Sequence, residues 1–119
     1  MPPDADAASD IVQACEEVQS RLVGKTIEDF AADAILRDSI VLQMIVIGES
    51  ARHLSENVRD QFPEVPWSDI WGMRNRLVHS YQATSLEVVW DTAQIDIPLL
   101  RQLMQRWLDD EDRRLSRDV

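Results

Sequence analysis

Apolar residues recur at every third or fourth position from Leu36 to Val58, near the middle of the chain. Side chains with this spacing lie on one face of an α-helix. Val41, Ile45 and Val46 widen the face, so this helix is expected to be buried on more than one side. The two prolines of FPEVP (residues 62–66) cannot lie in a helix interior, which predicts that the helix ends there. The pattern comprises Leu36, Ile40, Met44, Ile47, Ala51, Leu54 and Val58.

The same spacing predicts a helix before this one. Gly24 favours the end of that first helix, because glycine is common just past a helix C-terminus. The segment TIED (residues 26–29) is then similar to a capping box, which opens a new helical segment. The apolar face of the first helix comprises Ile11, Cys15, Val18 and Leu22.

Two further helices are expected in the second half of the chain. One begins near Pro66, because proline suits a first helical position. The segment TSLE (residues 84–87) has the form of a capping box and opens the other. The apolar spacing of this last helix continues through Pro98, which predicts a kink or a restart without a change of direction. The two faces comprise Trp67, Ile70, Trp71, Arg74, Leu77, Val78 and Tyr81, and Leu86, Trp90, Ala93, Ile97, Leu100, Met104 and Trp107.

No stretch alternates in the manner of a β-strand, so the sequence predicts an all-α fold. Amphipathic helices with short links favour an antiparallel bundle of four to five helices. A length of 119 residues fits a single domain. We expect a flexible N-terminal arm over residues 1–9, a helical bundle over 10–110 and a charged C-terminal tail over 111–119.

Charge and composition limit the functions that this chain can have. A net charge of −10 argues against wholesale binding to nucleic acid or to an anionic membrane, although a local basic site remains compatible with it. Cys15 is the only cysteine, so no disulfide can form within one chain. The N-terminus lacks the features of a signal peptide, and the apolar stretch at residues 39–48 is too short to span a bilayer. The expected location is cytoplasmic.

The segment RNRLVHSY (residues 74–81) is the main candidate for chemistry. Arg74 lies in an apolar stripe, where it could either reach water with its guanidinium or hold an anion such as phosphate in a partly dehydrated cleft. Asn75 stands one turn before His79 and can orient its ring. Arg74 and His79 are five residues apart, which separates them by about 140° around a helix. One copy of the motif therefore does not converge on a single point, unless the helix ends near His79 or a second copy completes the site.

Tyr81 and the pair of Glu49 and His53 are two further candidates, and each also has a purely structural explanation. Tyr81 is by default a core or interface aromatic residue, although its hydroxyl could accept a modification. Glu49 and His53 are one turn apart, and such a pair can hold a metal in a helical bundle. A usable metal site would need a second Glu-His set, and the chain has only two histidines, so we predict no metal site.

The motif and its surroundings resemble the HepT-like ribonucleases of the HEPN superfamily. RNRLVHSY has the form R-x-x-x-x-H-x-Y of that family, and the resemblance extends from about Ile11 to Leu108. IVIGESARHLSENV is similar to the family's long second helix with its Gly48-Glu49 pair. FPEVPWSDIWGMRNRLVHSY is similar to its proline-tryptophan entry into the motif helix, and LEVVWDTAQIDIPLL to its last helix.

The resemblance implies an all-α bundle that forms a homodimer, in which two motifs meet in one cleft. It also implies a metal-independent endoribonuclease that acts as a toxin and needs no cofactor. Its partner would be a minimal nucleotidyltransferase antitoxin, which transfers AMP to the motif tyrosine. By position, the catalytic residues would be Arg74 and His79 with Asn75 in support, and Tyr81 would accept AMP.

The chemistry of these side chains fits such a reaction. A histidine can take the proton of the ribose 2′-hydroxyl or protonate the leaving oxygen, because its pKa lies near neutrality. An arginine can bind the phosphate and offset the developing charge. We expect Arg52 and Arg76 to add to a local basic cleft for RNA. The alternative is a non-catalytic helical subunit that binds a nucleotide or presents a partner to the nucleotidyltransferase.

Overall fold

The computed structural model describes residues 3–117, and these form helices and turns without any strand. The prediction of an all-α bundle is therefore confirmed. Four long helices make up most of it: α1 (Pro3–Leu22), α3 (Ala34–His53), α5 (Trp67–His79) and α7 (Ile97–Arg117). The shorter elements are α2 (Ile27–Ala32), α4 (Glu56–Asp60), the 3₁₀-helix η1 (Tyr81–Ala83), α6 (Leu86–Asp91) and the π-helix η2 (Thr92–Asp96).

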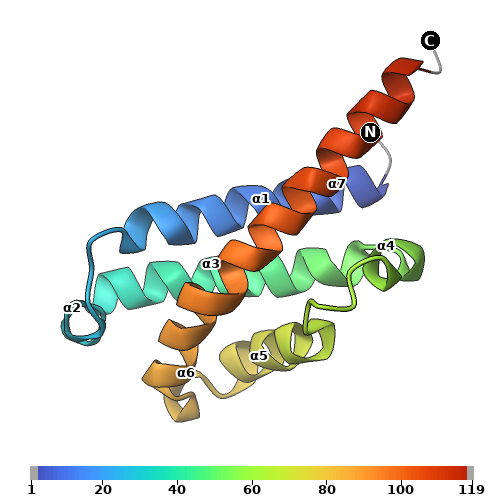
Figure 1. Cartoon of the computed structure of the whole chain (residues 1–119). Coiled ribbons are helices and arrows are strands. Elements are labelled where there is room, and N and C mark those ends of the chain that lie inside the picture. Colours follow the sequence, from blue (N-terminus) through green and yellow to red (C-terminus); the bar gives the residue numbers. More distant parts are fainter. Residues whose placement is uncertain (1–2, 118–119) are drawn as a thin grey trace.

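Helix α3 is the centre of the arrangement, because it packs against α1 and against α5. Figure 1 shows that α1, α3 and α5 run in alternating directions, as an antiparallel bundle requires. Helix α7 packs against α1 and crosses the bundle obliquely, and its C-terminal end extends beyond it. No helix in the described part of the chain is long and apolar enough to span a membrane.

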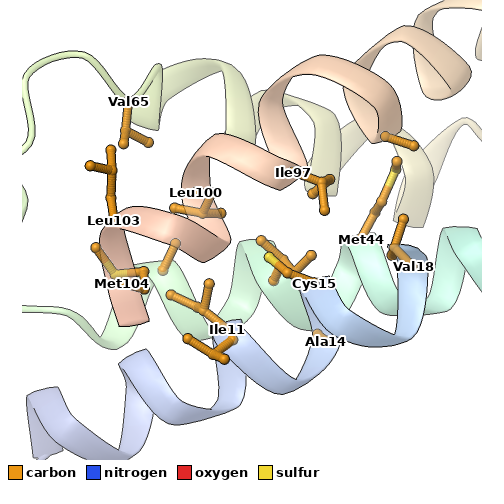
Figure 2. Close-up of a cluster of buried hydrophobic side chains, with 14 of the residues drawn as sticks. Ile11, Ala14, Cys15, Val18, Met44, Val65, Ile97, Leu100, Leu103 and Met104 are labelled. Atoms are coloured by element: carbon orange, nitrogen blue, oxygen red, sulfur yellow. The ribbon is translucent and has the colours of Figure 1, made fainter. Parts of the chain in front are cut away.

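The core lies where α1, α3 and α7 meet, as Figure 2 shows. Its fully buried side chains include Ile11 and Val18 of α1, Ile47 of α3 and Leu100 of α7, all at positions that the apolar spacing predicts. Cys15 is among them, and burial raises the pKa of its thiol to about 12. The thiol therefore stays protonated at neutral pH and serves as a small apolar core residue.

The first two links of the chain are as the sequence predicts. Helix α1 ends at Leu22, and Gly24 follows with a φ of +73°, a backbone conformation that favours glycine. The hydroxyl of Thr26 accepts a hydrogen bond from the backbone N–H of Asp29, and the Asp29 carboxylate accepts one from the backbone N–H of Thr26. This reciprocal pair is the predicted capping box, and it starts α2.

The N-terminal segment differs from the predicted flexible arm, because α1 begins at Pro3. Residues 1 and 2 lie outside the described residues. Alanine is the strongest helix former, and its small side chain permits close packing, so Ala5, Ala7 and Ala8 are buried without any large apolar residue. The Asp4 carboxylate accepts a hydrogen bond from the backbone N–H of Ser55 at 2.6 Å, which ties this end of α1 to the start of α4.

The central helix is shorter than its apolar pattern predicts. Helix α3 ends at His53, and the hydroxyl of Ser55 caps the separate helix α4 by accepting a hydrogen bond from Val58 N–H. Leu54 and Val58 are nevertheless buried. Leu54 lies directly after α3 and Val58 lies in α4, and both side chains pack into the core. Serine favours the N-cap position, so Ser55 is the signal that marks this break.

The start of the last helical segment also differs from the prediction. The cap of α6 is Ser85, which accepts from Val88 N–H, and not Thr84. The helical conformation continues from α6 through η2 into α7, which begins at Ile97, one residue before Pro98. In η2 the backbone N–H of Ile97 donates to the carbonyl of Thr92. The wider π-turn accommodates a proline that cannot donate to the carbonyl four residues earlier.

The predicted C-terminal tail is helical over its described part, since α7 continues to Arg117. Ion pairs between neighbouring turns accompany it, joining Arg113 to Asp110 and Arg114 to Glu111. Oppositely charged residues three apart lie side by side on a helix and stabilise it. Residues 118 and 119 lie outside the described residues.

Candidate functional site

The motif helix α5 is anchored at its start by a tryptophan. Pro66 is its N-cap, and the indole N–H of Trp67 donates to the carbonyls of Arg59 and Phe62 at 3.2 and 3.1 Å. Met73 and Leu77, one turn apart, are the buried residues of the helix. These contacts position the first turns of α5, which precede Arg74 in the sequence.

Arg74 lies where α3 and α5 approach each other most closely in the site. A Cβ atom added to Gly48 would lie 2.4 Å from the Cβ of Arg74 and 2.8 Å from its Cγ. The arginine stem therefore lies directly against the bare backbone of α3, and its side chain is only 22% exposed. Glycine is needed at position 48, since any larger residue would push the two helices apart.

Glu49 supplies a counter-charge for Arg74. Its carboxylate lies 3.0 Å from Nη2 of Arg74 and 3.9 Å from both Nη1 of Arg52 and Nε2 of His53. Arg52 and Arg74 therefore lie beside the same carboxylate. That they form a basic site for RNA stays a prediction. No group of three or more metal-binding side chains occurs among residues 3–117.

Several polar atoms at this contact lack a hydrogen-bond partner although they are buried. They are Nε of Arg74, Nε1 of Trp71 and Oε2 of Glu49. The Glu49 oxygen is close enough to Arg74 for an ion pair, but it is not aligned for a hydrogen bond. Buried polar groups are normally hydrogen-bonded, and the exceptions concentrate at functional sites. The Nε donor of Arg74 is therefore left without a hydrogen-bond acceptor within this chain.

The predicted partner of Asn75 differs from the observed one. Its side-chain oxygen accepts a hydrogen bond from Nη1 of Arg74 at 3.1 Å, and the described residues show no hydrogen bond between Asn75 and His79. Asn75 therefore orients the arginine. That it also orients the histidine remains a prediction.

His79 is the last residue of α5, and it is exposed. It forms no hydrogen bond or ion pair with another described residue, and five helical positions separate it from Arg74. The helix continues to His79, so the angular separation of about 140° persists within one chain. A single chain does not bring the two residues together.

Arg76 lines a cavity to which neither Arg52 nor Arg74 contributes. The cavity has a volume of about 200 Å³, and Asp69 and Asp96 also line it. Burial and then the negative charge of Asp69 raise the pKa of Asp96. Arg76 therefore has two acidic groups beside it, and its contribution to RNA binding stays a prediction.

Tyr81 begins η1, directly beyond the motif helix, and is 42% exposed. Its hydroxyl donates a hydrogen bond to Oδ1 of Asp38 at 2.6 Å. This hydrogen bond, burial and the negative charge of Asp38 raise the pKa of Tyr81. The phenol is therefore held in its protonated form against the N-terminal half of α3.

Sequence reasoning missed three of these contacts. Gly48 could have been suspected, because an isolated glycine inside a helix often permits a close approach. The pairing of Glu49 with Arg74 and of Asp38 with Tyr81 left no signal, since both acidic residues are far from their partners in sequence. Both contacts depend on how α5 and η1 lie along α3.

The chain is similar to known ribonucleases. The family "Ribonuclease HepT-like" matches residues 11–107. A protein of Caldanaerobacter subterraneus subsp. tengcongensis, named as a candidate RNase, is 34% identical over 101 residues, which cover 85% of this chain and 90% of that protein. The "Probable ribonuclease HepT" of Thermococcus cleftensis is 29% identical over 96 residues, which cover 81% of this chain and 87% of that protein.

No solved structure gives a significant match. The match to the family covers most of the described chain and includes the whole motif helix. This match agrees with the helical fold and with the expected order of the helices. The chain belongs to the HepT-like ribonuclease family.

Proposed function

We propose that this protein is a metal-independent endoribonuclease whose catalytic residues are Arg74 and His79. The observation that carries the proposal is the contrast between them. Arg74 is packed against Gly48 and its Nε has no hydrogen-bond partner, whereas His79 is exposed at the end of the same helix. An oriented cation suits phosphate binding, and an accessible imidazole suits proton transfer.

In the proposed reaction, His79 takes the proton of the ribose 2′-hydroxyl, and the oxygen attacks the adjacent phosphate. The bond from phosphorus to the 5′-oxygen then breaks, and a second His79 protonates that oxygen. Arg74 binds the phosphate and offsets its charge. Two histidines and a converging arginine require a homodimer, and the exposed Val78 beside His79 is a suitable apolar contact for one.

We further propose that the enzyme is the toxin of a toxin–antitoxin pair, silenced when a minimal nucleotidyltransferase transfers AMP to Tyr81. Tyr81 is exposed over almost half of its surface and lines an open groove, as modification by a partner requires. AMP two residues from His79 would add bulk and negative charge, which exclude RNA. Intact-mass measurement after incubation with the partner and ATP should show added AMP, and the adduct should be absent from Tyr81→Phe. AMP on any other residue would remove Tyr81 from this role.

The ribonuclease proposal is tested with purified protein free of AMP, fluorescent RNA and EDTA. We expect Arg74→Ala and His79→Ala each to lower the cleavage rate by about 100-fold or more, because each removes a transition-state interaction. Arg106→Ala, an exposed arginine of α7, is the matched control and should cleave at the wild-type rate.

Mixing wild type with an excess of His79→Ala separates a shared site from a site within one chain. Each mixed dimer has one His79, and the proposed reaction uses two, so the mixture should cleave RNA more slowly than the same amount of wild type alone. An undiminished cleavage rate in the mixture would contradict the shared cleft. Wild-type protein that does not cut RNA would favour the non-catalytic alternative.

A further inference from the structure

Tyr81 lies in an open groove that also contains two charged residues of α3. The groove has a volume of about 610 Å³, and its lining includes Arg37, Asp38 and Tyr81, with Val41 and Val89 among its apolar walls. Sites for small molecules and cofactors commonly have volumes of about 300–1,000 Å³. The groove is therefore large enough to receive part of a nucleotide beside the tyrosine hydroxyl.

Asp38 is in place to act on that hydroxyl. Its Oδ1 accepts the Tyr81 hydrogen at 2.6 Å, although 43 positions separate the two residues. A general base must lie within about 2.6–3.2 Å of the atom that gives up the proton. Asp38 meets this requirement and comes from a long helix, which fixes its position.

Arg37 supplies a positive charge to the same groove. Its Nη1 donates to the carbonyl of Phe30 at 3.2 Å and to that of Ala31, so the guanidinium is held at the end of α2. The hydrogen bond to Asp38 raises the pKa of Tyr81, and the charge of Arg37 opposes that effect. Arg37 is thus near enough to influence the phenol, and a guanidinium binds phosphate oxygens well.

We propose that Asp38 accepts the phenolic proton of Tyr81 during nucleotide transfer, and that Arg37 binds the phosphate being transferred. The proposal rests on the proposed modification of Tyr81 by a partner that holds the ATP. A bond forms between the tyrosine oxygen and the α-phosphorus, while the bond from that phosphorus to pyrophosphate breaks. The proton passes to Asp38, and pyrophosphate leaves. The modified chain then supplies two catalytic residues to its own modification.

The experiment follows AMP transfer to full-length protein by intact mass, with the partner nucleotidyltransferase in excess and ATP saturating. Asp38→Asn keeps the shape of the side chain but removes the base, so transfer should slow by about 100-fold or more. Asp38→Glu should restore part of the rate, and Arg37→Gln should also slow transfer. Asp91→Asn, an exposed aspartate of α6 outside the groove, is the matched control and should behave as wild type.

Chemical rescue separates a catalytic base from a structural contact. Formate added to Asp38→Ala should raise the transfer rate, because a free carboxylate can enter the space and accept the proton. A wild-type rate in Asp38→Asn, or no response to formate in Asp38→Ala, overturns the role of Asp38. Absence of AMP from Tyr81 of the wild-type protein overturns the modification itself, and with it this proposal.

Discussion

The two ends of the motif segment are attached to the same helix in different ways. At one end, Arg74 lies against Gly48 and pairs with Glu49 near the C-terminus of α3. At the other, the half-exposed Tyr81 is joined to Asp38, near the N-terminus of α3, by one hydrogen bond. Backbone packing fixes the arginine, whereas a single polar contact holds the tyrosine. The first arrangement suits a residue that must stay in place, and the second suits one that must react.

Substitution of Gly48 should have the largest effect on this comparison. Gly48→Ala places a Cβ atom 2.4 Å from that of Arg74, so α3 and α5 must separate. We expect the free energy of unfolding to fall by about 1–3 kcal/mol, as is typical of overpacking. Urea unfolding followed by circular dichroism measures it.

Gly72→Ala is the matched control for that variant. A Cβ there meets only the Nη1 end of the flexible Arg76 side chain, at 3.3 Å. Alanine in a helix interior is more stable than glycine by about 0.5–1 kcal/mol, so this variant should be slightly stabilised. Equal stability of Gly48→Ala and wild type would show that the contact between the helices does not fix Arg74.

Removal of the Glu49 charge should have an intermediate effect. Glu49→Gln leaves the largely buried guanidinium of Arg74 without its counter-charge, and the Glu49 side chain is 44% exposed. We expect a loss of about 1 kcal/mol, the upper end for a pair that solvent reaches. The loss should shrink in about 1 M salt, which screens exposed charges.

Glu16→Gln tests whether that effect belongs to the site. Glu16 lies 4.0 Å from Arg101, and its side chain is 58% exposed, so the loss of its charge should leave stability nearly unchanged. If Glu16→Gln and Glu49→Gln lowered stability equally, the pairing of Glu49 with Arg74 would have no special role.

Tyr81→Phe should have the smallest effect on stability. It removes one hydrogen bond at an exposed position, worth about 0.5–1 kcal/mol. Because folding raises the pKa of Tyr81, the stabilisation should be complete below the pKa of the unfolded tyrosine and be lost as the pH rises through the folded value. Urea unfolding of both proteins across this alkaline range measures the difference.

The same hydrogen bond can be observed directly, because Tyr81 is the only tyrosine in the chain. Phenolate absorbance reports its titration without interference from another tyrosine. The midpoint should lie above the ordinary value for tyrosine in the wild type and should fall in Asp38→Asn. An unchanged midpoint in that variant would place the hydroxyl away from Asp38.

The sequence predicted the helices well because burial of one face imposes a simple period. The residues Ile11, Ile47 and Leu100 all follow it and are all buried. It predicted helix ends less well, since competing caps such as Thr84 and Ser85 are adjacent and tertiary packing chooses between them. The small-residue start of α1 was also missed, because alanines at the N-terminus carry little apolar signal.

The sequence names candidate site residues, whose roles stay predictions, but it does not give their contacts. Arg74, His79 and Tyr81 could be named from spacing and family resemblance, whereas Glu49 and Asp38 became partners only through the packing of α5 and η1 on α3. Arg76 shows the same limit: two positions from Arg74 in sequence, it faces a different cavity.

The bare helix surface at Gly48 has a consequence for how the protein tolerates change. The place of Arg74 depends on the distance between two backbones, and many combinations of core side chains can produce that distance. The core can therefore accumulate substitutions while the guanidinium keeps its position, provided that residue 48 has no side chain. Substitutions in the core and an unchanged position of Arg74 are thus compatible in one small bundle.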